Sequence, residues 1–136
     1  MKIYMDLCCL NRPFDDQSQA RIVLEGQAVV LILEKLDRGE HAFCNSAALV
    51  VENSLSPRTQ VRLEIDGLLG RADIWIAHDD AIDERAAELR GLGFREFDAY
   101  HLAAAEVAGC DFLVTCDDKL LKAGRRNAGR IGVTVT

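Results

Sequence analysis

Three aspartates in this sequence stand at the ends of apolar segments, where functional groups gather in many α/β proteins. Asp6 directly follows the apolar segment Ile3–Met5, and Asp117 directly follows Phe112–Cys116. Asp98 opens the Ala-rich stretch that precedes the second of these segments. In an open parallel sheet such groups meet beyond the carboxyl ends of the strands. Carboxylates brought together in this way are typical ligands of a hard divalent cation, Mg²⁺ or Mn²⁺ rather than zinc.

The position of Asp98 follows from the lengths of the elements after it. A helix from Asp98 to Cys110 travels about 18 Å at 1.5 Å per residue. A strand from Asp111 to Cys116 returns about 16–17 Å. The two distances nearly cancel, so we expect Asp98 and Asp117 at the same edge as Asp6. Glu52 should lie about 9 Å below this rim, with a side chain that leans toward the helix N-terminus and can reach the cluster.

Four carboxylates at one edge repel one another and raise one another's pKa unless a cation is present. A divalent ion relieves this repulsion, lowers the pKa of a bound water and offsets charge on a phosphodiester undergoing hydrolysis. The sequence contains no Ser/His/Asp order, GxSxG, HExxH, Walker A or GxGxxG motif, so covalent and nucleotide-cradling mechanisms lack their parts. The acids therefore indicate metal-dependent phosphodiester hydrolysis.

Strand and helix patterns alternate along the chain, which predicts a parallel sheet with helices on both faces. Strands are expected at 2–6, 41–45, 73–77, 112–116 and 132–135. Helices are expected from a cap at Ser18 to about Asp37, over 47–55 with Ser46 as cap, from Ser56–Pro57 to Gly70, from Asp79 through Leu89, over 95–108 and over 117–122. A turn-rich loop is expected at 11–16. The acidic run 79–84 suits the first turn of a helix and needs no functional role.

Composition indicates one globular domain over residues 1–136, with 49% hydrophobic and 28% charged residues. The longest apolar run, Ala28–Leu33, is far shorter than the roughly 20 residues of a membrane helix, and no signal-peptide pattern follows Lys2. A net charge of −6 argues against a general nucleic-acid coat protein but not against a metal-loaded nuclease. Five cysteines without a CxxC pair are expected to be reduced, packed thiols of a cytoplasmic protein.

The sequence resembles the PIN-domain family, and in particular its VapC-like metal-dependent ribonucleases. The resemblance covers nearly the whole chain through IYMDLCCLN, SAALVVEN, FDAYHLAAAEVAGCDFLVTCDD and the final short strand. It implies a three-layer α/β/α sandwich with a parallel sheet of about five strands. It also implies Mg²⁺- or Mn²⁺-dependent cleavage of single-stranded RNA, and often a toxin with a paired antitoxin. By this match Asp6, Glu52, Asp98 and Asp117 correspond to the family's metal-binding quartet.

Each of the four acids also has a simpler interpretation. Asp6, Asp98 and Asp117 could be helix caps or turn residues, and Glu52 an exposed helix acid. Four auxiliary candidates lie nearby: Asn11, Thr115, Asp118 and His101. Asn11 either contacts the cluster or makes its turn. Thr115 either orients Asp6 or a metal-bound water, or only fills a strand. Asp118 rivals Asp117 as ligand. For His101, a buried or half-buried histidine with hydrogen-bond partners for its ring nitrogens is favoured over a catalytic one.

Basic residues follow Asp117 and also begin elements near the same rim. They would hold RNA phosphates on either side of the scissile bond, or else form a solvated helix face. The candidates are Arg12, Arg58, Lys119, Lys122, Arg125, Arg126 and Arg130. Phe14 is the only evident stacking residue, which favours weak sequence readout or readout through a partner.

Two rival functions remain at this stage. The chain could keep the fold as a catalytically silent binding or regulatory module. It could also be a receiver-like phosphoacceptor that uses Asp79 or Asp80 and Lys119. The latter fits poorly, since Leu7 and Cys8 are not acids and two helices are expected between the third and fourth strands. The apolar stretch 28–33 and the helix 57–69 also predict a homodimer.

Overall fold

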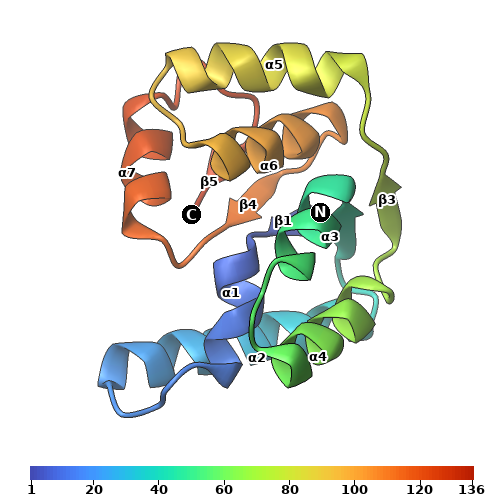
Figure 1. The fold of residues 1–136 in the computed structure, drawn as a ribbon, viewed down its shortest axis with the longest axis vertical. Helices are drawn as coiled ribbons and strands as arrows, with labels where there is room; N and C mark the ends of the chain where they lie inside the picture. Colours follow the sequence, from blue (N-terminus) through green and yellow to red (C-terminus); the bar gives the residue numbers. More distant parts are fainter.

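The computed structural model describes residues 1–136, and five short parallel strands form its centre. The strands are β1 (Lys2–Met5), β2 (Ala42–Ser46), β3 (Ile74–Ile76), β4 (Phe112–Val114) and β5 (Thr134–Val135), in the spatial order β3-β2-β1-β4-β5. All four strand pairs are parallel. Figure 1 shows the helices arranged around this sheet. The predicted parallel sheet of about five strands is confirmed.

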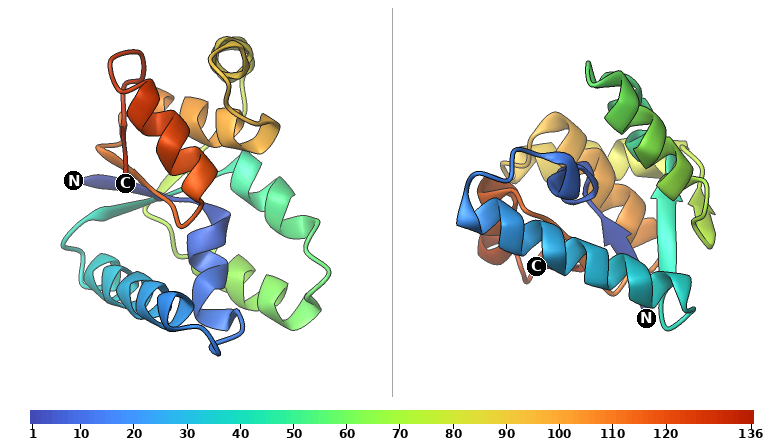
Figure 2. Two further views of the ribbon diagram at one scale, coloured as in Figure 1. Left: turned by 90° about the vertical axis from the view of Figure 1, so that its left-hand side faces the viewer. Right: turned by 90° about the horizontal axis from the view of Figure 1, so that it is seen from below.

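Helices cover both faces of the sheet, which gives the expected three-layer α/β/α sandwich. Figure 2 shows α2 (Ala20–Asp37) and α4 (Thr59–Leu69) on one side of the sheet. On the other side lie α5 (Asp80–Gly91), α6 (Glu96–Val107) and α7 (Asp118–Arg126). The helix α3 (Ala47–Ser54) follows β2 directly and contacts α4 and α6. The layers enclose a core of 29 buried hydrophobic residues.

The strand register explains why the carboxyl edge carries the polar groups. Met5 pairs with Val114, so the next residues, Asp6 and Thr115, lie beside each other. On the other side of β1, Tyr4 pairs with Cys44, which brings Ser46 to the level of Asp6. Parallel strands end together at this edge, and each of the helices that follow β1, β2 and β4 begins there.

Several predicted boundaries are wrong, each for a local reason. Ser18 does not cap α2, because its backbone N–H donates to Asp16 Oδ1 at 2.9 Å and Gln19 becomes the N-cap. Ser56–Pro57 does not start α4, since Arg58 has a non-helical backbone (φ −83°, ψ 84°) and the helix begins at Thr59.

The expected loop at 11–16 is also largely helical. A short helix α1 (Leu7–Asn11) and a 3₁₀ turn η1 (Arg12–Phe14) fill the segment that follows β1. The last helix, α7, runs to Arg126 rather than ending at 122, because the Asn127 side chain donates to the Ala123 carbonyl at 2.9 Å and closes its last turn. The predicted end of α2 at Asp37 is confirmed, with Gly39 in the left-handed region at φ 72°.

Gly124 marks a close approach between α7 and β5. A Cβ built at Gly124 would lie 2.7 Å from Val135 Cβ, whereas one at Gly67 on α4 would meet nothing within 4 Å. We expect Gly124→Ala to lower the free energy of unfolding by about 1–3 kcal/mol through overpacking. Gly67→Ala, the matched control, should raise it slightly, because alanine is the better helix former. Urea denaturation measures both, and equal stabilities would contradict the close packing of α7 on β5.

Candidate metal and nuclease site

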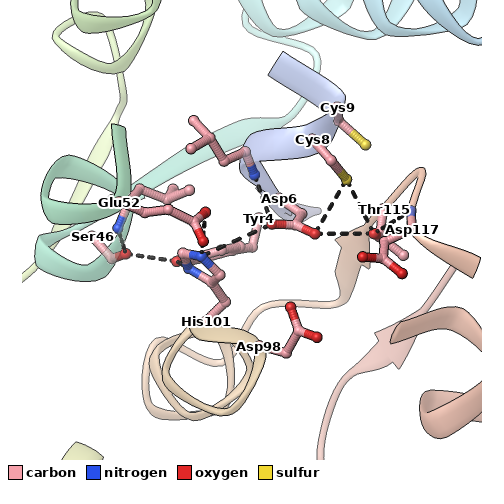
Figure 3. A network of polar contacts seen from close by, with 12 residues as sticks. Tyr4, Asp6, Cys8, Cys9, Ser46, Glu52, Asp98, His101, Thr115 and Asp117 are labelled. Carbon is pink, nitrogen blue, oxygen red and sulfur yellow. Dashed lines mark hydrogen bonds and ion pairs between the residues drawn. The ribbon is translucent and has the colours of Figure 1, made fainter. Parts of the chain in front are cut away.

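All four predicted acids line one cleft at the carboxyl edge of the sheet. The cleft has a volume of about 490 Å³, and Asp6, Glu52, Asp98 and Asp117 all contribute to its wall. They come from the ends of β1 and β4, from α3 and from the first turn of α6. Figure 3 shows their side chains around a common space. Residues separated by up to 111 positions are thus brought together.

Asp6 is the most deeply buried of these acids, and its environment is fixed on every side. Its Oδ1 accepts from the Leu7 backbone N–H at 2.7 Å, so it is also the N-cap of α1. Its Oδ2 accepts from the Thr115 hydroxyl at 3.0 Å, so Thr115 contacts this carboxylate directly. Burial, followed by the nearby Cys8 thiol, raises the pKa of Asp6 to about 7, although His101 opposes the shift.

Glu52 reaches the cluster, as its place in the second turn of α3 allowed. Its Oε1 lies 3.1 Å from His101 Nε2 (Figure 3), and that nitrogen is 3.9 Å from Asp6 Oδ1. One ligand atom from each of Asp6, Glu52 and His101 lies within 4.8 Å of the other two. Asp98 and Asp117 line the same cleft but are not part of this close group.

His101 is completely buried and connects the cluster to the sheet. Its Nδ1 lies 2.6 Å from the Tyr4 hydroxyl, which in turn lies 2.6 Å from Ser46 Oγ. Ser46 Oγ also accepts from the Leu49 N–H at 3.1 Å and so caps α3. The other ring nitrogen of His101, Nε2, faces Glu52; burial acts to lower the pKa of His101, but the hydrogen bond to Glu52 and the charge of Asp6 raise it above its usual value. The predicted buried histidine is confirmed, and it holds Glu52 in place.

Asp98 and Asp117 are joined by an arginine that the sequence analysis did not single out. Arg95 Nε donates to Asp98 Oδ2 at 2.9 Å, and its Nη2 forms an ion pair with Asp117 Oδ2. Burial raises the pKa of Asp98 despite this ion pair. Partial burial also acts to raise the pKa of Asp117, but Arg95 and the N–H groups at the start of α7 hold it below its usual value. The spacing of three between Arg95 and Asp98 was the available signal for this pair.

The simpler interpretations of these acids hold only in part. Asp6 and Asp117 do cap helices, yet both also line the cleft. Asp98 lies inside the first turn of α6 and does not cap it, and Glu52 is half-buried rather than exposed. Asp79 caps α5 through the Ile82 N–H at 2.9 Å, which agrees with a structural role for the acidic run that follows it.

The side chains of two of the auxiliary candidates, Asn11 and Asp118, make no hydrogen bond with the four acids. Asn11 lines the cleft but hydrogen-bonds to the Leu7 carbonyl and to Arg58, so it makes the turn and not a contact to the acids. Asp118 points away from the cluster and binds Arg21 at 2.7 and 3.0 Å. Asp117, rather than Asp118, therefore belongs to the cleft.

A second cleft of about 430 Å³ adjoins the acidic one and contains most of the nearby positive charge. It shares Cys8, Arg95 and Asp117 with the acidic cleft and adds Arg12, Arg21 and Lys119. It also contains Glu25 and Asp118, which form ion pairs with Arg12 and Arg21. Arg12 and Lys119 were predicted to bind RNA, whereas Arg21 was missed. Of the other candidates, Arg58 is paired with Asp15 at 2.9 Å, and the remaining ones lie on the exposed surface outside both clefts: Lys122, Arg125, Arg126 and Arg130.

The five cysteines are free thiols, and three of them are buried. Cys9 Sγ lies 3.4 Å from Cys116 Sγ, and Cys44 lies 3.5 Å from Cys110 in the core. Cys8 Sγ is 3.3 Å from Asp6 Oδ2, so it contributes to the wall of the site as well as to packing. None of the helices combines the length and apolar character that crossing a membrane requires.

Neither a protein-family model nor a curated protein sequence matches this chain, but solved structures do. One, VapBC2 from Rickettsia felis bound to a DNA fragment from its promoter, is similar over 100% of this chain and 98% of that chain, with 17% identity and a TM-score of 0.64. Another, FitAB bound to the IR36 DNA fragment, is similar over 98% of this chain and 94% of that chain, with 19% identity and a TM-score of 0.58. The chain therefore has a PIN-like fold, as its sequence resemblance to the PIN-domain family implied.

Proposed function

We propose that the protein is a Mg²⁺- or Mn²⁺-dependent endoribonuclease that hydrolyses phosphodiester bonds of single-stranded RNA. One observation carries this proposal: four carboxylates from four separate segments line a single cleft at the carboxyl edge of a PIN-like sheet. Acids of like charge are not gathered in this way for stability, because each raises the cost of ionising the others.

The residues present fit a hard divalent ion. Asp6 Oδ, Glu52 Oε1 and His101 Nε2 are close enough to share one ion, and Asp98 and Asp117 lie on the same cleft. Asp6, Asp98 and Asp117 would hold the ion, while Glu52 would hold it or position the attacking water. When bound, the ion would lower the pKa of a water molecule and stabilise the negative charge that develops on the phosphate oxygens. His101 keeps the Glu52 carboxylate directed into the cleft. A cation held in the cleft would favour the ionised form of Asp6, whose proton would pass to solvent.

The adjoining basic cleft supports RNA as the substrate. Arg12, Arg21 and Lys119 lie on its wall and would hold phosphates next to the scissile bond. Water would attack phosphorus directly, with the carboxylates and the ion that they would hold lowering its pKa. The chemistry is therefore a single displacement without a covalent enzyme intermediate.

The family resemblance also suggests a toxin with an antitoxin partner. The free cysteines suggest a cytoplasmic protein, and the apolar stretch 28–33 with the helix 57–69 suggests a homodimer. Exposed apolar side chains support protein partners, since Leu24, Val30 and Leu31 on α2 and Leu63 on α4 all face solvent. We expect light scattering at micromolar concentration to give twice the monomer mass. A monomer mass would contradict the dimer and leave the nuclease proposal unaffected.

The decisive experiment is an RNA cleavage assay with purified protein. Mn²⁺ should support cleavage of single-stranded RNA, EDTA should abolish it, and added Mn²⁺ should restore it. Asp80→Asn, at an exposed position on α5, should cleave as well as the wild type, whereas Asp6→Asn should not cleave. RNA binding that is insensitive to chelator, without cleavage under any condition, would instead favour the catalytically silent binding module.

A further inference from the structure

Arg95 already occupies two of the four carboxylates that the proposed metal site requires. Its guanidinium binds Asp98 through Nε and Asp117 through Nη2. Each of these acids therefore has a guanidinium partner, whereas Asp6 and Glu52 face the imidazole of His101. The cleft thus has one half that Arg95 neutralises and one half that His101 faces.

A divalent ion and this guanidinium compete for the same two carboxylates. A guanidinium carries one positive charge and is attracted to paired carboxylates as a metal ion is, but it offers no open position for water. An ion that takes the Oδ2 atoms of Asp98 and Asp117 as ligands must break both contacts of Arg95. The structure therefore describes the site with its own cation in place.

The Arg95 side chain is free to leave. It is 52% exposed, and although Arg95 is the N-cap residue of α6, its side chain makes no capping hydrogen bond. Moving the guanidinium therefore breaks no capping hydrogen bond of the helix. A displaced side chain remains on the wall shared by the acidic and the basic cleft, next to the positions proposed for RNA phosphates.

We propose that Arg95 is an internal counter-ion that alternates between two anionic partners. Without metal it neutralises Asp98 and Asp117; with metal bound it is released and binds the RNA phosphate beside the scissile bond. This inference rests on the proposed nuclease function and adds a positioning residue to it. By linkage, metal binding and RNA binding then strengthen each other, because each favours the released state of the same side chain.

Mn²⁺ titration calorimetry on the full chain tests the first half of this inference. Arg95→Gln should bind Mn²⁺ about tenfold more tightly than the wild type, since no charged hydrogen bonds must be broken. Arg21→Gln is the matched control: it removes the same charge from the neighbouring cleft, but from an arginine paired with Asp118 rather than with the site acids. Its Mn²⁺ affinity should stay within about twofold of the wild type.

Steady-state cleavage tests the second half. Arg95→Gln should raise the KM for single-stranded RNA even though its metal site fills more readily, and Arg95→Lys should restore part of the affinity for RNA. Tighter metal binding together with weaker RNA binding is not expected from a residue that only supports the fold.

The outcomes are distinguishable. Equal Mn²⁺ affinity of Arg95→Gln, Arg95→Lys and wild type, with cleavage retained, would overturn the role of Arg95 and leave the nuclease standing. If Arg21→Gln bound Mn²⁺ more tightly by the same factor, the change in affinity would come from net charge alone, which would also overturn the role of Arg95. No Mn²⁺ binding by the wild type would remove the nuclease proposal itself, and the inference with it.

Discussion

Replacing Asp6 by asparagine is expected to stabilise the metal-free protein at pH 8 by about 2 kcal/mol and to lower RNA cleavage by at least about 100-fold. The two effects have one cause. Asp6 is 5% exposed and ionises only with difficulty, so its charge destabilises the fold whenever no cation is present. The same negative charge would bind the cation that cleavage requires, so its removal should abolish most of the activity.

The dependence on pH follows from the direction of the pKa shift. Burial raises the pKa of Asp6 from 3.8 to about 7, so between these values the folded state holds a proton that the unfolded state has released. Raising the pH through this window therefore favours unfolding. The shifted pKa of Asp6 lowers the free energy of unfolding by at most about 4 kcal/mol above pH 7. Asp98, whose pKa is also raised, acts in the same direction.

Thermal and urea unfolding in EDTA from pH 4 to pH 8 measures the effect. The stability advantage of Asp6→Asn over wild type should be small near pH 4, grow as pH rises, and level off above pH 7. Added Mn²⁺ should stabilise the wild type at pH 8 and the variant much less. A variant that is less stable than wild type at pH 8 in EDTA would show that Asp6 serves the fold rather than a ligand.

The second large effect is expected at His101, whose replacement by alanine should cost about 3–4 kcal/mol of folding stability. Truncation leaves a buried cavity and removes the partner of the buried Tyr4 hydroxyl. It also frees Glu52, so cleavage should fall in the variant even below its unfolding temperature. His101→Gln, which keeps a polar group near Tyr4 or Glu52, should lose less stability.

His78 supplies a matched histidine outside the site. Its ring is about half exposed, hydrogen-bonds to Asp83 at 2.8 Å and lies beside the Tyr100 ring, so His78→Ala should change stability by less than about 0.5 kcal/mol and leave cleavage unchanged. Urea denaturation and the RNA cleavage assay on the same preparations give both values. Similar small effects at the two histidines would contradict the buried Tyr4–His101–Glu52 connection.

Much of the fold was predictable because strands and helices reveal themselves in local patterns. Apolar segments such as 112–116 and Ala-rich amphipathic stretches such as 95–108 predicted the correct alternation, and hence a parallel sheet. Boundaries were harder where a contact across the chain decided them. Arg58 is anchored by Asn11 and Asp15, more than 40 residues away, and the start of α4 depends on that anchor.

The amino-acid sequence by itself determined which residues end the strands, and therefore that Asp6, Asp98 and Asp117 belong to one edge. A parallel sheet brings the carboxyl ends of its strands together whatever the loops do, which places Asp6 and Asp117, and the lengths of the helix and strand between Asp98 and Asp117 place Asp98. Only the tertiary structure decided that Glu52 reaches the cluster, that His101 directs it through Tyr4 and Ser46, and that Arg95 neutralises two of the acids. These contacts depend on how separate helices pack over the sheet edge within a few tenths of an ångström. Packing at that precision is a property of the whole core and is not encoded in any local pattern.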